Sequence, residues 1–333
     1  MNARNLKMAS HFLKHRFRKL HPFEVQALLT DNCDLKCVYC ACPKRKTPMM
    51  TTEQWLETIR GLAALGTMRI KFQGGEPTVR PDFRTLSAAA RQAGLITAVI
   101  TNGLRISAQP ELLDNLHEVV VSLDSPTPEV HDRLRGKGTH KRALAALDLA
   151  RSRGLKTYVV MVASRANVSL VEKMLDLCEE RGVALHVQPA IFGLSSFDEG
   201  GRQLGLDGEA MRRLHRALAE YKRRGRALMF SARSYRNVVD WPDYSVLTTR
   251  SRGPSGCMAG RFYFHIEANG DVWPCAQFGA SFTPKNVVRD GLTEALRAVH
   301  SHDCGDCFTT YLNERKAVFS LEPRAVLGVI RRG

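Results

Sequence analysis

The sequence predicts an α/β fold built on a parallel β-sheet, and three observations lead to this class. From Phe23 onward, short β-rich runs alternate with amphipathic stretches. Six such runs between helices are typical of a sheet assembled from strand–helix units. Polar and glycine-rich motifs also follow several runs directly, where the functional loops of such sheets lie. The predicted strands cover residues 24–29, 68–72, 96–100, 119–123, 157–162 and 184–187.

Five helices are predicted between these strands, and local signals mark some of their ends. Thr51 can cap the first helix, and Gln54 three residues later completes a capping-box pattern. Gly154 and Gly182 stand where the C-caps of two later helices are expected. The predicted helices cover residues 52–65, 81–93, 110–116, 141–153 and 170–181.

The composition is that of an ordinary soluble globular protein. Of the 333 residues, 44% are hydrophobic and 25% are charged, and no apolar run is long enough to span a bilayer. The basic N-terminal stretch lacks the apolar core and cleavage site of a secretory signal. We therefore expect a cytoplasmic protein, in which the nine cysteines are metal ligands more often than disulfide partners.

Three cysteines, Cys33, Cys37 and Cys40, form a C-x3-C-x2-C run shortly after the first predicted strand. Three thiolates this close can bind three irons of a [4Fe-4S] cluster and leave the fourth iron open to another ligand. A structural zinc site takes four ligands, usually in pairs, so zinc fits an isolated run of three poorly. Cys42 beside the run is interpreted as a bystander, and Cys178 in a helical stretch as a core thiol.

A second group of four cysteines frames a predicted β-hairpin in the C-terminal part of the chain. Asn269 and Gly270 form its turn, between strands at residues 262–267 and 272–275. Four thiolates held by a hairpin and a C-x2-C knuckle suit either tetrahedral zinc or a fully ligated iron–sulfur cluster. The cysteines of this group are Cys257, Cys275, Cys304 and Cys307.

Three short motifs lie at the ends of the second, third and fourth predicted strands. Paired glycines let a ligand approach the backbone closely, and an adjacent acid can accept hydrogen bonds from an ammonium group. Each motif alone is an ordinary turn, but their position after the cysteine run indicates a common site. The motifs are Gln73-Gly74-Gly75-Glu76-Pro77, Thr101-Asn102-Gly103 and Ser122-Leu123-Asp124-Ser125.

Over about residues 23–191, the cysteine run and these motifs resemble the radical S-adenosylmethionine (radical SAM) superfamily. The resemblance implies a partial (β/α)6 barrel, similar to a TIM barrel, with a [4Fe-4S] cluster on Cys33, Cys37 and Cys40. It also implies that S-adenosylmethionine (SAM) chelates the open iron through its amino and carboxylate groups.

The resemblance implies roles in SAM binding for eight residues. Gly74, Gly75 and Glu76 would hold the amino group of SAM. The His-Asp-x-x-Arg segment at residues 131–135 would place Arg135 on the methionine carboxylate. The further residues implied are Ser122 and Asp124, for the ribose and carboxylate, together with Gln73 and Asn102.

The C-terminal cysteines resemble the SPASM and twitch extensions of radical SAM enzymes. The shared features are Cys257 and the segment in which Gly270 precedes Pro274-Cys275. The resemblance implies one auxiliary [4Fe-4S] cluster, closed by four cysteines. Full SPASM extensions have further cysteines, one at about the position of Asn313, and none follows Cys307 here. We therefore expect the shorter twitch form, a small β-hairpin domain that binds one auxiliary cluster.

The function implied is that of an enzyme that cleaves SAM to a 5′-deoxyadenosyl radical, which abstracts hydrogen from a substrate. We expect a small-molecule, sugar or glycolipid substrate, because only 32 residues precede Cys33 and many peptide-modifying members begin with a leader-binding domain. The expected reaction is of the dehydrogenase or epimerase type, with flavodoxin or ferredoxin as the electron donor. No catalytic residue is assigned, although Tyr263, His265, Glu267 and Asp271 are candidates to face the substrate.

Three alternatives remain open. The same architecture could modify ribosomal peptides, or decarboxylate intermediates of haem synthesis. A basic zinc-binding protein that contacts nucleic acid would use the net charge of +16 and both cysteine groups. It would leave the motifs at successive strand ends unexplained, so nucleic acid is the less favoured partner.

The predicted organisation has five parts. Residues 1–22 form a basic amphipathic helix, 23–192 the partial barrel, 193–224 a connector and helix, 225–320 the auxiliary cluster domain, and 321–333 a basic tail. Both basic ends could touch an anionic membrane, although packing on the barrel is favoured.

Overall fold

A nine-stranded sheet is the centre of the computed structural model, which describes residues 22–192, 197–250, 256–276, 282–300, 304–322 and 325–326, apart from the side chain of Arg250. The strand order is β10-β9-β8-β1-β2-β3-β4-β5-β6. From β1 to β6, neighbouring strands pair in parallel and in the order of the sequence. These six strands are β1 (Glu24–Thr30), β2 (Arg69–Gly74), β3 (Ile96–Thr101), β4 (Glu118–Ser122), β5 (Lys156–Ala163) and β6 (Ala184–Pro189).

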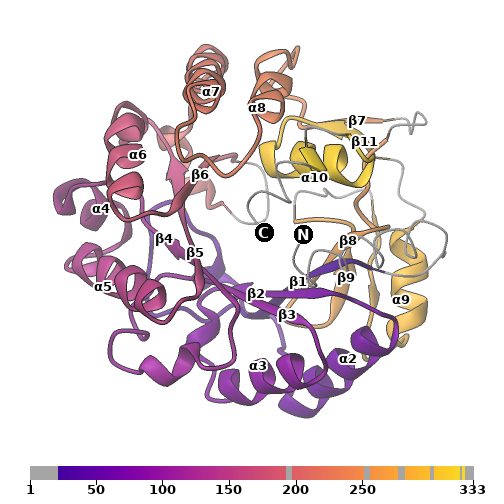
Figure 1. Ribbon diagram of the computed structural model, residues 1–333. Coiled ribbons are helices and arrows are strands. Elements are labelled where there is room, and N and C mark those ends of the chain that lie inside the picture. The colour runs from indigo at the N-terminus through magenta and orange to yellow at the C-terminus, as the bar shows by residue number, and fades with distance from the viewer. Residues whose placement is uncertain are drawn as a thin grey trace.

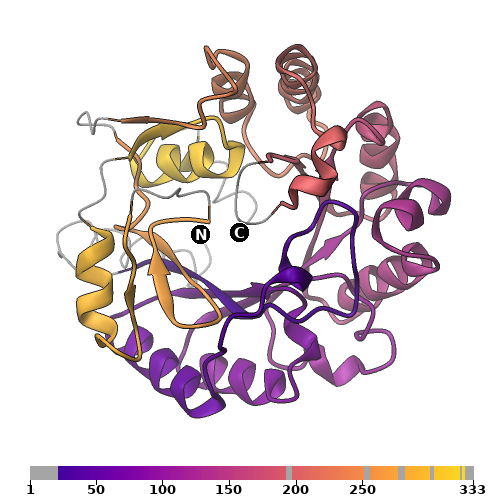
Figure 2. The ribbon, with the colours of Figure 1, turned by 180° about the vertical axis from the view of Figure 1, so that it is seen from behind.

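Helices cover the outer side of this curved sheet, so the predicted partial barrel is confirmed (Figures 1 and 2). The capping box at Thr51 is present, and Gly154 and Gly182 follow their helices with positive φ angles of 71° and 60°. The covering helices are α2 (Thr52–Ala64), α3 (Phe83–Gln92), α4 (Pro128–Arg135), α5 (Thr139–Ser152) and α6 (Val171–Glu180).

The main core lies between the sheet and these helices. Val25 and Leu29 alternate along β1 and pack with Trp55 of α2, and all three side chains are fully buried. Burial of each large apolar side chain contributes about 1.5–3 kcal/mol. Because successive residues of a strand face opposite sides, Glu24 and Gln26 point into the barrel interior.

The C-terminal part adds the predicted hairpin to the barrel sheet. Strand β8 (Tyr263–Ile266) pairs antiparallel with β9 (Asp271–Trp273), which confirms the hairpin. The sequence did not predict that β8 also pairs in parallel with β1, with Gln26 opposite His265. The remaining strands are β10 (Lys285–Asn286), beside β9, and the antiparallel pair β7 (Thr248–Arg250) and β11 (Cys304–Cys307).

Further helices follow the barrel in the described part of the chain, and Figure 1 shows α7, α8 and α10 between the β6 side and the β8 side of the sheet. The helix expected within residues 193–224 corresponds to α7, whereas the helices that accompany the hairpin between residues 225 and 320 were not predicted. Short helices such as α8 gain most of their stability from packing, which a sequence pattern shows weakly. These helices are α7 (Gly208–Arg223), α8 (Ala232–Val239), α9 (Leu292–Val299) and α10 (Thr310–Phe319).

Short 3-10 helices occupy several loops, and one of them replaces a predicted α-helix. The segment 110–116 forms the 3-10 turn η3 (Pro110–Leu113), which ends at Asp114. The others are η1 (Cys42–Lys44), η2 (Pro77–Val79), η4 (Val168–Leu170) and η5 (Glu199–Leu204).

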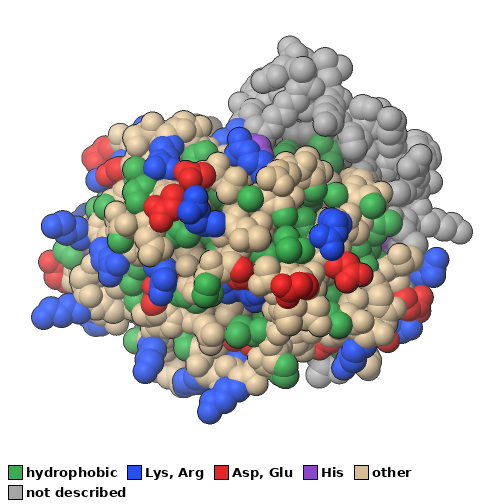
Figure 3. Space-filling model, turned by 90° about the horizontal axis from the view of Figure 1, so that it is seen from below, with side chains coloured by type: hydrophobic (Ala, Val, Ile, Leu, Met, Phe, Trp, Pro, Cys, Tyr) green, Lys and Arg blue, Asp and Glu red, His purple; other side chains and the backbone are tan. Residues whose placement is uncertain are grey.

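The predicted N-terminal helix lies outside the described residues, except for Pro22, as does most of the tail. Lys and Arg side chains are scattered among Asp and Glu on the face in Figure 3. Within the described ranges, no helix has the length and apolar character to cross a bilayer.

Candidate active site at the strand ends

The first cysteine group lies on the loop that follows β1, above the ends of the barrel strands. Cys33, Cys37 and Cys40 are all partly buried. The loop is tied to α4 by a hydrogen bond from the Val38 amide to the Leu134 carbonyl at 3.0 Å. The sulfur of Cys33 also accepts the Leu35 amide at 3.4 Å. One loop therefore carries all three thiols of the predicted cluster.

The paired glycines pack backbone to backbone against the start of this loop. The Gly75 amide donates to the Thr30 carbonyl at 2.7 Å, and the Glu76 amide to the Asn32 carbonyl at 2.8 Å. A Cβ on Gly75 would lie 2.2 Å from the Asn32 carbonyl oxygen. Only glycine allows this approach, which places the Gly74–Glu76 segment beside Cys33.

We expect Gly75→Ala to lose iron from the first cluster site, because the methyl group forces the cysteine loop away from β2. The measurement is the iron content of the anaerobically reconstituted protein. Gly94→Ala is the control, since a Cβ there meets nothing within 4 Å and costs only about 1–2 kcal/mol of left-handed strain. Wild-type iron content in Gly75→Ala would contradict this prediction.

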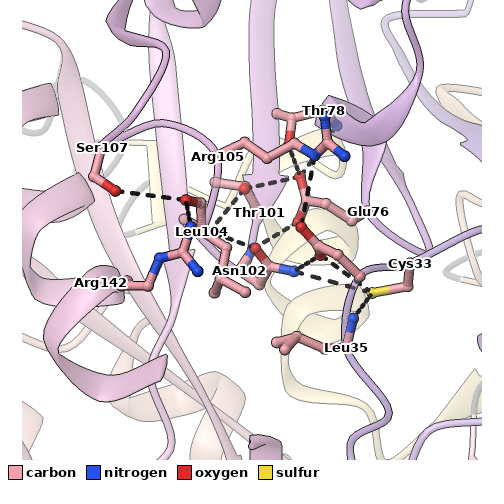
Figure 4. A network of polar contacts seen from close by, with 12 residues as sticks. Cys33, Leu35, Glu76, Thr78, Thr101, Asn102, Leu104, Arg105, Ser107 and Arg142 are labelled. Carbon is pink, nitrogen blue, oxygen red and sulfur yellow. Dashed lines mark hydrogen bonds and ion pairs between the residues drawn. The ribbon is translucent and has the colours of Figure 1, made fainter. Parts of the chain in front are cut away.

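Glu76 is buried and organises the neighbouring strand ends (Figure 4). Its Oε1 accepts the Thr78 amide and hydroxyl at 3.1 and 2.6 Å and the Thr101 hydroxyl at 2.9 Å. Its Oε2 accepts the Asn102 amide at 2.7 Å. Burial raises the pKa of Glu76, although these hydrogen bonds act against the shift. Because a carboxylate oxygen can accept two bonds, Oε2 retains capacity for an ammonium donor.

Asn102 joins the same network to the cysteine loop (Figure 4). Its side-chain amide donates to Asp34 at 2.7 Å and lies 4.0 Å from the sulfur of Cys33. Its carbonyl accepts the Leu104 amide at 2.9 Å. The structure therefore gives Asn102 a positioning role for the loop, and its contact with SAM stays a prediction.

Asp124, which follows β4, and Arg135 on α4 form a buried ion pair next to the cysteine loop. Arg135 donates from Nε at 2.7 Å and from Nη2 at 3.1 Å. Asp124 also accepts the Val162 amide at 2.9 Å and the hydroxyl of Tyr39 in the cysteine run. Asp124 thus serves Arg135, β5 and the loop at once, which favours a positioning role over the predicted contact with SAM.

Arg135 retains donor capacity for the predicted carboxylate contact. Burial acts to lower its pKa, but the charge of Asp124 outweighs burial and holds that pKa well above its usual value. Its Nη1 makes no hydrogen bond to the described part of the chain. A permanently charged guanidinium with a free donor suits a carboxylate.

Ser122 and Gln73 lie on the interior face of the sheet. Ser122 follows Glu118 and Val120 on that face of β4, and its side chain is nearly buried. Gln73 donates to Gln26 at 3.2 Å. Both side chains lie on the face of the sheet opposite the covering helices, and their cofactor contacts stay predictions.

The donor groups of this region fit a [4Fe-4S] cluster with SAM. Three thiols share one loop, the glycine backbone borders them without side chains, and Arg135 faces them from α4. Among the described residues, no three Cys, His, Asp or Glu side chains converge on a position for a single metal ion. A [4Fe-4S] cluster does not require such convergence, because each thiolate binds a different iron.

The second cysteine group lies in a separate buried cluster. All four side chains are less than a tenth exposed and pack with Tyr263, Tyr311 and Phe319. The thiols of Cys257 and Cys304 share a hydrogen bond, and the Cys257 amide donates to the Gly305 carbonyl at 2.7 Å. The four cysteines come from three separate segments of the chain and share one buried cluster.

Asn313 and Cys42 have local partners. The Asn313 amide donates to the Cys307 carbonyl at 3.0 Å and so supports the loop that carries the last cysteine. A hydrogen bond from the Cys42 thiol lowers the pKa of Cys40 to about 6, although burial opposes the shift. Cys42 is thus a direct neighbour of the first cysteine group.

A chain of charged groups from the cysteine loop to β8 was not predicted. Arg45 lies 3.8 Å from Asp31 and 3.6 Å from Glu267, and Glu267 lies 3.2 Å from Nε2 of His265. His265 is 2% exposed, and its Nδ1 has no hydrogen-bond partner within the described ranges. The pairing of β8 with β1 creates this chain, and no local sequence signal reports that pairing.

Comparison with known proteins identifies similar sequences and folds. Residues 28–178 match the family model for the radical SAM superfamily. The chain is 34% identical over 170 residues to the PqqA peptide cyclase of Ruegeria pomeroyi, over 48% of this chain and 45% of that relative. It is 28% identical over 290 residues to the PqqA peptide cyclase of Rhizobium meliloti, over 83% of this chain and 74% of the relative.

A solved structure shows the same fold. SuiB of Streptococcus suis, bound to its precursor peptide SuiA, superposes with a TM-score of 0.66 and 20% identity. The superposition covers 90% of this chain and 73% of SuiB.

The comparisons correct the predicted partner. The small-molecule or lipid-linked substrate is wrong, because the sequence relatives are named PqqA peptide cyclases and SuiB holds a precursor peptide. They give no support to the predicted membrane contact. Cofactor motifs specify the shared chemistry of SAM, which is why they pointed to the correct cofactors and the wrong substrate.

Proposed function

We propose that the chain is a radical SAM enzyme that modifies a peptide. The observation that carries the proposal is the similarity to a PqqA peptide cyclase over 290 residues, which extends beyond the SAM-binding region into the C-terminal cysteine group. The fold supports it, because β8 brings that part of the chain onto the barrel sheet.

The residues that would hold the cofactors follow from the two cysteine groups. Cys33, Cys37 and Cys40 would bind the [4Fe-4S] cluster that carries SAM. The C-terminal cysteines would close one auxiliary [4Fe-4S] cluster: Cys257, Cys275, Cys304 and Cys307. When bound, the first cluster and SAM together supply a 5′-deoxyadenosyl radical that takes a hydrogen atom from the substrate.

The chain's own residues would orient SAM at the strand ends. Arg135 would pair with the methionine carboxylate through its free Nη1. The carbonyl groups of Gly74 and Gly75, with Oε2 of Glu76, would accept from the amino group. Ser122 would offer its hydroxyl from the interior face of β4.

The interior face of the barrel sheet offers polar groups that suit a peptide. Burial lowers the pKa of Lys71 to about 8 and that of His186 to about 3, so His186 is neutral at pH 7. Gln26 and Gln73 supply neutral donors and acceptors that match a peptide backbone. A peptide backbone carries many such neutral groups, so it could pair with these side chains and leave few of them without a partner.

His265 is the residue best placed to accept a proton from the bound peptide. Glu267 holds one side of its ring, and the opposite nitrogen, Nδ1, is free for a substrate. A base oriented by a carboxylate is the arrangement that general base catalysis requires. The bond that breaks is a substrate X–H bond, whose electron pair stays on the peptide.

We propose that the net reaction removes two hydrogens from the peptide and forms a cross-link. Joining two positions that each carry hydrogen requires this oxidation. An auxiliary cluster closed by four thiolates has no open iron for the substrate, so an electron-transfer role suits it.

The test combines cofactor analysis with a peptide assay. Two [4Fe-4S] clusters predict about eight irons per chain and 5′-deoxyadenosine after reduction in the presence of SAM. Short peptides encoded beside the gene would be coexpressed with the enzyme and examined by mass spectrometry for the loss of two hydrogens. Stoichiometric zinc without iron would contradict the cofactor assignment. The release of 5′-deoxyadenosine with no modified peptide would contradict the substrate class.

A further inference from the structure

A buried line of contacts joins the barrel interior to the second cysteine group. Glu24 on β1 forms an ion pair with Arg315 on α10. The Arg315 guanidinium lies 5.3 Å from the ring centre of Tyr263 and 5.1 Å from that of Tyr311. The Tyr263 hydroxyl lies 3.5 Å from the sulfur of Cys257. The line therefore ends on a thiol of the proposed auxiliary site.

The role of the Tyr263 hydroxyl as donor or acceptor follows from its partner. Its side chain is 1% exposed, and its one hydrogen bond within the described chain is to Cys257. A thiolate bound to iron has no proton and can only accept. With a cluster in place, Tyr263 must donate this bond to the sulfur.

The Arg315 side chain is also held in place by its neighbours. Its side chain is 16% exposed, and the guanidinium lies near two tyrosine rings. Burial acts to raise the pKa of Glu24, but the cations Arg315, Lys71 and Arg69 outweigh it and lower that pKa to about 2. Glu24 is thus ionised at all ordinary pH values and holds Arg315 in place.

The hydrogen bond from Tyr263 and the charge of Arg315 would change the reduction potential of the cluster in the same direction. Reduction of an iron–sulfur cluster adds one negative charge, and its potential depends on hydrogen bonds to the sulfurs and on local charge. A donated hydrogen bond and a nearby cation both favour the more negative state. Each therefore raises the reduction potential.

We infer that Tyr263 and Arg315 set the reduction potential of the auxiliary cluster, Tyr263 through its hydrogen bond to Cys257 and Arg315 through its charge and its stacking on Tyr263. The inference rests on the proposed function, because it requires a cluster on the second cysteine group. Both side chains act through the cluster ligand and are positioning residues.

The test is a potentiometric titration of Tyr263→Phe, followed by electron paramagnetic resonance. The full-length chain would also carry Cys33→Ala, Cys37→Ala and Cys40→Ala, so that the auxiliary cluster alone gives the signal. We expect a fall in potential that corresponds to at least a tenfold weaker one-electron reduction, about 59 mV. Tyr311→Phe is the matched control, because Tyr311 stacks on the same arginine and no hydrogen bond from it to a cysteine is found in the described ranges. A smaller change in Tyr263→Phe, or an equal change in Tyr311→Phe, overturns the inference.

A second pair of variants tests Arg315 separately. Arg315→Met is expected to lower the potential, and Arg315→Lys to recover part of the fall because it restores the charge. If the reduction potentials of Arg315→Met and Arg315→Lys were equal, the charge would make no contribution. That result would overturn the role of Arg315. The iron content distinguishes failure of the proposed function from failure of this inference. About four irons in the wild type would refute the auxiliary cluster of the proposed function. About eight irons with an unshifted Tyr263→Phe potential would refute this inference alone.

Discussion

Asp124→Asn is expected to lower the free energy of unfolding by about 3–5 kcal/mol, since it removes one partner of a buried ion pair and leaves the other charged. Asp124 is 0% exposed and Arg135 is 9% exposed. The neutral amide cannot replace a carboxylate that receives Arg135, Tyr39 and the Val162 amide together. The cysteine loop would loosen with the pair, because Tyr39 belongs to that loop.

The measurement is denaturant unfolding of Asp124→Asn beside Asp114→Asn. Asp114 also pairs with arginines, but its side chain is 46% exposed. Exposed ion pairs contribute about 0–1 kcal/mol, so the control should unfold almost like the wild type. Equal stability of the two variants would show that the Asp124–Arg135 pair does not support the fold.

Cys37→Ala is expected to abolish 5′-deoxyadenosine formation and to lose the iron of the first cluster. Two thiolates cannot hold a [4Fe-4S] cluster as three do, and the iron that SAM chelates disappears with it. The auxiliary site should keep its iron, because the second cysteine group lies on other segments of the chain. The assays are iron content and chromatographic detection of 5′-deoxyadenosine after reduction.

Cys178→Ala is the matched control for Cys37→Ala. Cys178 is fully buried in the core beside the barrel helices, away from both cysteine groups. Its loss should cost some stability and leave the iron content unchanged. If Cys37→Ala cleaved SAM at the wild-type rate, the assignment of the first cluster site would fail.

The fold of residues 24–189 could be predicted because its signals are local. The run of β1 and the capping box at Thr51 each depend on a few adjacent residues, and both are confirmed. The same holds for the Asn-Gly hairpin at residues 263–273. The family and its cofactors were recognised for the same reason, since the cysteine run and Gly-Gly-Glu motif are short.

The features that were missed depend on contacts between distant segments. The pairing of β8 with β1 sets Tyr263 beside Glu24 and His265 beside Gln26, and no periodicity reports it. The positioning role of Asp124 arises because Tyr39, Arg135 and β5 converge on one carboxylate. The substrate class was predicted wrongly because no short motif in the sequence describes the molecule between the two cysteine groups.

The parallel pairing of β8 with β1 also has a consequence for how the chain reaches its native state. Strand β1 is synthesised before the other strands of the barrel, and its partner β8 emerges only after them. Until then the β1 edge presents unpaired backbone groups, which can pair with other chains. Such a distant contact slows folding through its loop-closure entropy. A chain truncated before β8 should therefore aggregate, even though all six barrel strands are present.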